Sequence, residues 1–66
     1  MKHYIIETKE SDSAPARPVT MHGKVRTFAS HTIAVRMARL VKTEYPGYTV
    51  WVVSRGQEGQ EERIKV

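Results

Sequence analysis

One amphipathic helix constrains the fold of this chain more than any other feature of its sequence. Across residues 31–45 the apolar side chains fall within an arc of roughly 160° when plotted at 100° per residue. Ser30 is a suitable N-cap, and Pro46-Gly47 would end the helix, because proline cannot continue it and glycine permits a left-handed turn. The apolar arc consists of Ile33, Ala34, Met37, Ala38, Leu40, Val41 and Tyr45.

The flanking segments have the composition of strands. Residues 3–8, 24–28 and 48–54 are rich in β-branched and aromatic side chains, and residues 63–66 alternate like a short closing strand. Residues 21–23 either extend the second strand or form a turn before it. The polar, glycine-containing residues 56–62 are typical of a hairpin loop.

The order of these elements predicts a two-layer α+β fold, β-β-α-β-β. The chain has 66 residues, enough for a single domain spanning residues 1–66. A lone helix has to bury its apolar side against one face of an antiparallel sheet, which leaves the opposite face bare. The residues expected to meet between the layers are Met37, Leu40 and Val41 of the helix and Ile6, Val50 and Val52 of the strands.

Residues 9–20 are predicted to form a long loop. Pro15 and Pro18 lack backbone donors, and Ser11, Asp12 and Ser13 favour local turns. A loop of about 12 residues is long for so small a domain, so it is either mobile or functional.

Basic residues are concentrated in the middle of the chain. There are 11 Lys and Arg against 7 Asp and Glu, a formal charge of +4. Arg36, Arg39 and Lys42 recur every three residues opposite the apolar arc, and Lys24 and Arg26 are expected on one face of a strand. Such a surface attracts phosphates or an acidic protein, although a merely solvated helix face has the same composition.

Trp51 is the aromatic residue with the clearest potential to bind. If Val50 and Val52 face the helix, Trp51 lies on the bare face of the sheet, near Tyr4 or His3. There it could stack on a base or anchor a protein partner. The alternative is that Trp51 only covers the edge of a thin core.

The sequence predicts no catalytic, metal-binding or cofactor-binding residue, and hence no enzyme. There is no Cys, and the spacing of His3, His22 and His31 matches no zinc pattern. The glycines form neither a phosphate loop nor a dinucleotide fingerprint. Since no apolar run approaches the roughly 18 residues of a membrane span, we expect a soluble, cytoplasmic domain.

The chain enters its helix as FASHTIAVRMARLV and leaves it as YPGYTVWVV, and as a small β-β-α-β-β chain it resembles small phage-encoded single-domain inhibitors. These are anti-CRISPR proteins and a phage inhibitor of host RNA polymerase, and the resemblance in size and element order extends from Tyr4 to Val53. It implies a non-enzymatic domain that sits on a large host complex and blocks its nucleic-acid handling. Many anti-CRISPR proteins are acidic and imitate DNA, whereas this basic chain would meet an acidic protein surface or nucleic acid held by the complex.

Our first hypothesis is therefore a phage or mobile-element inhibitor that binds a host nucleoprotein complex. One alternative is a small basic DNA- or RNA-binding accessory domain, and another is an oligomerising structural subunit that pairs through its last strand. Monomer and dimer both remain open. The predicted partner-binding residues are Lys24, Arg26, Arg36, Arg39, Lys42 and Trp51.

Overall fold

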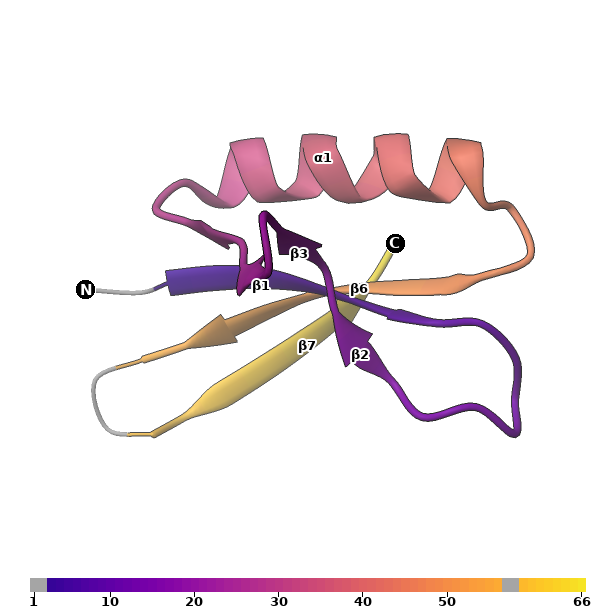
Figure 1. Ribbon diagram of the computed structural model, residues 1–66. Coiled ribbons are helices and arrows are strands. Elements are labelled where there is room, and N and C mark those ends of the chain that lie inside the picture. The colour runs from indigo at the N-terminus through magenta and orange to yellow at the C-terminus, as the bar shows by residue number, and fades with distance from the viewer. Residues whose placement is uncertain (1–2, 57–58) are drawn as a thin grey trace.

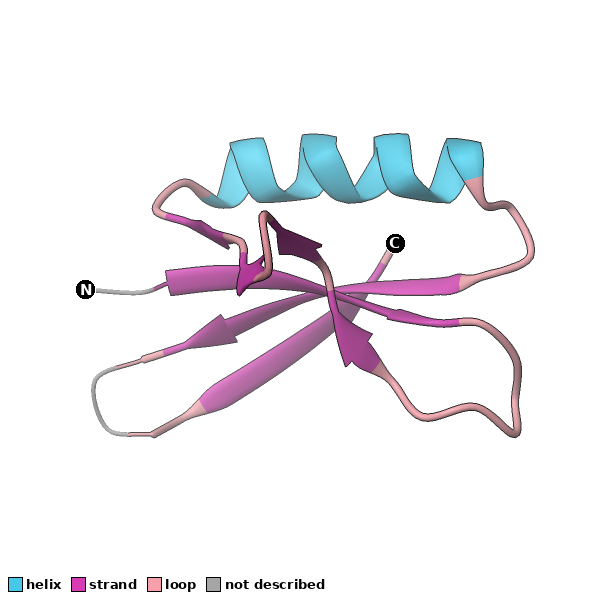
Figure 2. Ribbon diagram, viewed as in Figure 1, coloured by secondary structure: helices cyan, strands magenta, loops and turns pink. Residues whose placement is uncertain are grey.

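The computed structural model describes residues 3–56 and 59–66 and shows one helix lying across an antiparallel sheet (Figure 1). Helix α1 (His31–Glu44) covers one face of the sheet, and no element covers the other face in the described part of the chain (Figure 2). The predicted α+β class, with one helix packed on an antiparallel sheet, is confirmed.

The sheet is built around two long strands, β1 (His3–Lys9) and β6 (Thr49–Arg55). They pair along their whole length, from His3 opposite Arg55 to Lys9 opposite Thr49. Strand β7 (Glu61–Lys65) continues the sheet beyond β6. The strand order of the sheet is β2-β1-β6-β7, in which β2 (Arg17–Pro18) pairs with Glu7 and Thr8 of β1. Strand β5 (Thr27–Phe28) pairs with the same edge of β1 at Tyr4 and Ile5.

The predicted order of β-β-α-β-β is wrong in detail, because in the described residues β1 and four two-residue strands precede the helix. The predicted strand 24–28 is split. Its first half, β4 (Lys24–Val25), pairs with β3 (Thr20–Met21) in a separate hairpin, and only β5 reaches β1. His22 and Gly23 form the hairpin turn with φ of 54° and 79°, and positive φ at both positions matches the twist of a two-residue hairpin.

The predicted loop 9–20 is correspondingly shorter. Lys9 ends β1, residues 17–18 form β2, and residue 20 begins β3, which leaves residues 10–16 as the connection. The predicted hairpin loop 56–62 is also shorter, since β7 begins at Glu61, and its residues 57–58 lie outside the described residues.

Helix α1 begins and ends where the local signals predict. The Ser30 hydroxyl accepts a hydrogen bond from the backbone N–H of Ile33 at 3.3 Å, as an N-cap does. At the other end Tyr45 is the C-cap, and its N–H donates to the carbonyl of Val41. The helix therefore stops one residue before the predicted end, just ahead of Pro46.

The core lies between α1 and the two central strands and consists of Ile6, Phe28, Ala34, Ala38, Val50 and Val52. Ala34 and Ala38 are the only fully buried helix residues, while Met37 and Val41 are half-buried beside them. The expectation that Leu40 is buried is wrong, because 56% of it is exposed. Leu40 stands at one end of the predicted apolar arc. Because Ala34 and Ala38 face the sheet, the helix is rotated so that this end of the arc points to solvent, and Val35 contacts the core instead.

Candidate partner-binding surfaces

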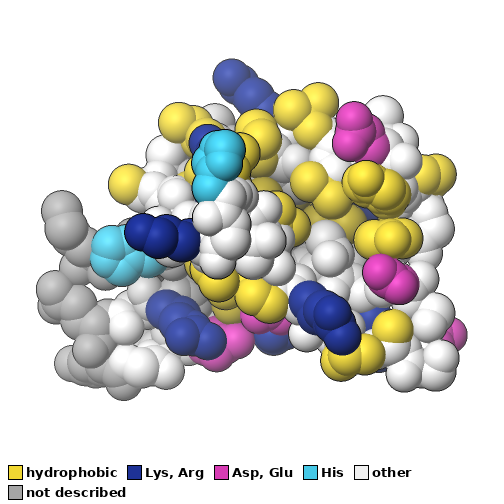
Figure 3. Space-filling model, in the orientation of Figure 1, with side chains coloured by type: hydrophobic (Ala, Val, Ile, Leu, Met, Phe, Trp, Pro, Cys, Tyr) yellow, Lys and Arg dark blue, Asp and Glu magenta, His cyan; other side chains and the backbone are white. Residues whose placement is uncertain are grey.

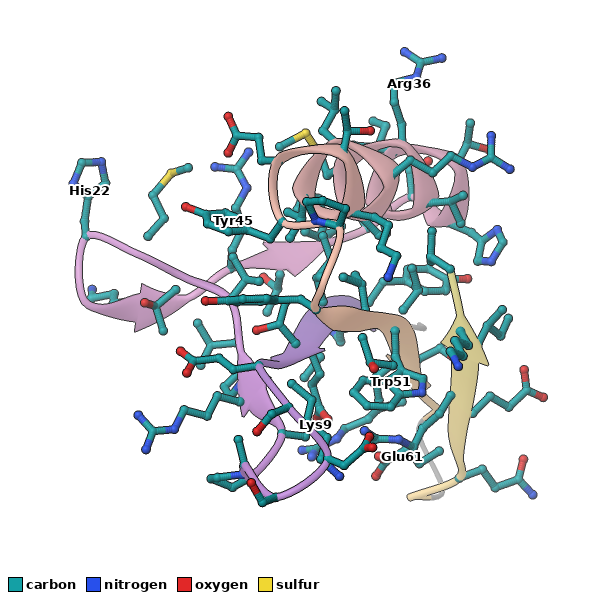
Figure 4. The ribbon with its side chains drawn as sticks, turned by 90° about the vertical axis from the view of Figure 1, so that its right-hand side faces the viewer. Lys9, His22, Arg36, Tyr45, Trp51 and Glu61 are labelled. Carbon is teal, nitrogen blue, oxygen red and sulfur yellow. The ribbon has the colours of Figure 1, made fainter. Side chains whose placement is uncertain are left out.

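The outer face of α1 carries two free arginines. Arg36 and Arg39 are exposed, and Figure 4 shows Arg36 extending away from the sheet. Neither forms an ion pair with any other described residue. They border a shallow hollow of about 430 Å³, whose lining residues are His31, Thr32, Val35, Arg36, Arg39, Leu40 and Thr43.

This face is apolar as well as basic. Ile33 is 51% exposed, and Leu40 reaches from the hollow toward half-buried Met37 and Val41 in a second depression of about 340 Å³. Figure 3 shows hydrophobic side chains together with charged ones along the upper edge of the molecule, where α1 lies. We refer to Ile33, Arg36, Arg39 and Leu40 together as the helix surface.

Lys42 does not belong to this surface, although its spacing predicted that it would. The lysine is half-buried, and its Nζ donates to the carbonyl oxygens of Pro46 at 3.1 Å and Tyr48 at 2.5 Å. Its charge thus stabilises the turn after the helix, where backbone carbonyls lack helical partners.

The same turn holds a pair of tyrosines. The rings of Tyr45 and Tyr48 stack with their centroids 4.9 Å apart. Burial raises the pKa of the Tyr48 phenol above its ordinary value of 10.0, and the nearby Glu10 carboxylate and the Tyr45 phenol raise it further.

Lys24 and Arg26 are not neighbours on one strand face. Lys24 is exposed in β4, whereas Arg26 lies between β4 and β5, where its guanidinium stands 5.2 Å from the centroid of the Phe28 ring and contacts the sulfur of Met21. Its Nε is buried without a hydrogen-bond partner in the described structure. Arg26 therefore packs within the domain, and Lys24 alone is free to meet a partner from this pair.

Val50 and Val52 face α1, and Trp51 therefore lies on the opposite face of the sheet, as expected (Figure 4). The expectation that Tyr4 is nearby is wrong, because Tyr4 is on the helix side and meets the His31 ring at 5.4 Å. Opposite Trp51 in the ladder stand Glu7 on β1 and Lys65 on β7.

Arg63 covers Trp51. Its guanidinium carbon is 5.1 Å from the centroid of the indole ring, and its Nη2 is 2.6 Å from an oxygen of Glu7, a side chain only 13% exposed. Sequence reasoning missed both partners of Trp51. Alternation in residues 63–66 placed Arg63 on one face with Lys65, but nothing local linked it to Glu7. The place where a base would stack on Trp51 is occupied by Arg63.

The uncovered sheet face also has an apolar hollow of about 520 Å³ beside the β3–β4 hairpin. Half-buried Ile5 and exposed Val25 of the hairpin contribute apolar surface to it, and Val53, which is fully buried, also borders it. The complete lining is His3, Ile5, Glu7, Pro18, Val25, Thr27, Val53 and Arg55.

Neither a metal site nor a membrane helix is found in the described residues. No group of His, Asp and Glu there is arranged to hold a metal ion. No helix in that part of the chain is both long and apolar enough to cross a membrane. Comparison with protein families, curated proteins and solved structures found no match to this chain.

Proposed function

We propose that this protein is a non-enzymatic binding domain that docks onto a host nucleoprotein complex through the helix surface and blocks its nucleic-acid handling. The observation that carries the proposal is the pairing of Arg36 and Arg39, which have no ion-pair partner among the described residues, with exposed Leu40 and Ile33. Such a face offers positive charges that lack an opposite charge and apolar area that a partner could bury.

This composition favours an acidic protein surface over bare nucleic acid as the contacted component. Arginine is enriched at protein interfaces, and large apolar side chains bury well against a protein partner. Binding to a phosphate backbone depends mainly on cations and gains little from exposed leucine and isoleucine. Ala34 and Ala38 are the fully buried residues of α1, and the larger Ile33 and Leu40 remain exposed on its outer face.

The resemblance to phage inhibitors gives the proposal its specific form. A small domain that occupies a working surface of a polymerase or of a CRISPR effector complex would act in the cytoplasm and need no chemistry of its own. Occlusion of that surface is sufficient for inhibition.

The experiment is a charge reversal, Arg36→Glu with Arg39→Glu. Lys42 is left unchanged because its contacts with Pro46 and Tyr48 stabilise the turn. The control variant, Lys9→Glu with Arg17→Glu, changes the net charge equally on residues that lie outside α1. Circular dichroism first establishes that both variants are folded.

Binding is then measured to purified host RNA polymerase, to CRISPR effector complexes, to duplex DNA and to single-stranded RNA across a salt series. We expect the helix variant to lose roughly a hundredfold or more in affinity for one complex, because bringing like charges together at an interface costs several kilocalories per mole, while the control binds normally. Steeply salt-dependent binding of the wild type to bare nucleic acid, lost in the helix variant, would instead identify a DNA- or RNA-binding accessory domain. Unchanged binding everywhere would show that the helix surface is only solvated.

A further inference from the structure

Strand β7 leaves one edge of the sheet open. Its five residues are all exposed, and no described strand pairs with its outer side. The opposite edge is different, since β2 and β5 are separated by the β3–β4 hairpin and Pro18 of β2 has no N–H to donate. An unpaired edge offers a row of backbone donors and acceptors to another strand.

The hydrogen-bond pattern shows which residues of β7 present these groups. The N–H of Val66 donates to the carbonyl of Val50 at 2.8 Å, and the N–H of Gly56 donates to the carbonyl of Gln60 at 2.9 Å. Bonded pairs alternate along an antiparallel ladder, so the even-numbered residues of β7 bond to β6. The N–H and C=O groups of Glu61, Arg63 and Lys65 therefore point outward.

We propose that β7 pairs antiparallel with β7 of a second copy of this chain, with the two-fold axis at Arg63, to form one sheet through both protomers. In this register Glu61 stands opposite Lys65 of the second copy, and Lys65 stands opposite its Glu61. Two oppositely charged cross-strand pairs form, one on each side of the axis. Lys65 has no ion-pair partner among the described residues of its own chain, and the exposed Glu61 carboxylate makes only long contacts, 3.9 Å to Arg55 and 3.5 Å to Arg63, so both side chains can make this contact.

The like charges at the axis are held apart by a contact already present in each protomer. Arg63 would face Arg63 of the second copy, which destabilises a pair of strands when the charges meet. Each Arg63, however, reaches back across Trp51 to Glu7 on β1, with 2.6 Å between its Nη2 and the carboxylate. The guanidinium therefore lies over its own sheet, neutralised and directed away from the axis.

Neighbouring registers fit less well. A shift of two residues in one direction places Glu62 opposite Glu62 and Glu61 opposite Arg63, but Arg63 is already bound to Glu7 of its own chain. A shift in the other direction places Arg63 opposite Lys65. On the helix side of the sheet, Ile64 is 47% exposed, and in the proposed register it lies diagonal to Ile64 of the second copy, within reach of a long side chain. Charged edge strands usually resist pairing, but the signs along β7 match those of its own antiparallel copy.

Two single charge reversals and their mixture test the register. Lys65→Glu places two carboxylates opposite each other at both ends of the interface, and Glu61→Lys places two ammonium groups there. A mixture of the two variants restores both attractive pairs, but only in the heterodimer. Lys24→Glu and Glu44→Lys carry the same charge changes outside β7 and are the controls.

Sedimentation velocity over a concentration series measures the association of each protein, and native mass spectrometry measures which dimers form. We expect wild type and controls to dimerise at high concentration, each reversal to raise the dissociation constant roughly tenfold or more, and the mixture to form heterodimers in preference to either homodimer. The amides of Glu61, Arg63 and Lys65 should also become protected from hydrogen exchange as concentration rises.

A wild-type protein that sediments as a monomer up to its solubility limit would overturn the proposal. Equal dimerisation of the reversed variants and the controls, or random mixing of the two variants, would also overturn it. Because none of these measurements uses the helix surface, their failure would leave the proposed docking of α1 unaffected.

Discussion

Truncation of Ile6 and of Leu40 to alanine tests how α1 sits on the sheet. Ile6 is 1% exposed at the centre of the core, whereas Leu40 is 56% exposed on the helix surface. The periodicity of the sequence places both in the core, and the structure places only Ile6 there. Leu40→Ala therefore reports the rotation of the helix, and Ile6→Ala gives the cost of a core truncation for comparison.

The expected costs differ several-fold. Removing a buried isoleucine side chain costs about 2–5 kcal/mol, from lost transfer free energy and from the cavity left behind. A domain of this size has a total stability of roughly 3–10 kcal/mol, so Ile6→Ala takes away a large share of it. Leu40→Ala removes mostly exposed surface and improves helix propensity slightly, so its cost should stay below about 1 kcal/mol.

Urea denaturation provides the measurement, followed by circular dichroism and by the fluorescence of Trp51, the only tryptophan. Ile6→Val, with an expected cost of about 0.5–1.5 kcal/mol, gives a measurable value should Ile6→Ala fail to fold. A Leu40→Ala variant that loses as much stability as Ile6→Ala would refute the arrangement in which Ala34 and Ala38 face the sheet.

Three further predictions concern the Glu7–Arg63 ion pair, the Tyr48 phenol and the loop of residues 10–16. Glu7→Ala removes the carboxylate that holds Arg63, and should change the fluorescence of the neighbouring indole and cost about 1 kcal/mol, whereas an unchanged spectrum would contradict the contact. Because folding raises the pKa of the Tyr48 phenol, its contribution to the free energy of unfolding should be fully present below pH 10.0 and should be lost as the pH rises above that value. Glu10→Gln should lower this pKa in an NMR titration, and an unshifted titration would argue against the proximity of the two groups. Residues 10–16, nearly all exposed and held by a single turn, should show low backbone order parameters by ¹⁵N relaxation, and uniformly high values would reject the prediction.

The helix could be predicted from its sequence, but its buried face could not. Ser30 and Pro46 are local signals, and they act within a few residues of themselves. Which part of an apolar arc is buried depends on how the helix is rotated against the sheet. Here Ala34 and Ala38 lie nearest the sheet, and hydrophobic periodicity alone does not distinguish this rotation from one that buries Leu40.

The division of the strand before the helix depends on competition between two pairing partners. Residues 24–28 have strand character throughout, yet β4 pairs with β3 and only β5 pairs with β1. The turn that decides this contains His22 at positive φ, a conformation that residues other than glycine seldom adopt. The composition of the segment therefore gave its strand character but not its partners.

The candidate surfaces were only partly predictable for a similar reason. The positions of Arg36 and Arg39 follow from helical spacing alone, and they lie outside as expected. Lys42 obeys the same spacing but is captured by carbonyls of the following turn. Trp51 lies on the face opposite the helix, and Arg63 is held over it by an ion pair with Glu7, near the other end of the chain.

Site-specific photo-crosslinking in living host cells tests the proposed docking of α1 most directly. A benzophenone amino acid replaces Leu40 on the helix surface or, as a control, Thr49 of β6, which alternates with buried Val50 and therefore lies on the sheet face opposite α1. We predict that the probe at position 40 forms a nuclease-resistant adduct with a protein subunit of a nucleic-acid-handling complex, and that Arg36→Glu with Arg39→Glu abolishes it. An adduct formed only from position 49, or one from position 40 that persists in the charge-reversed protein, would contradict the assignment of the helix surface as the binding site.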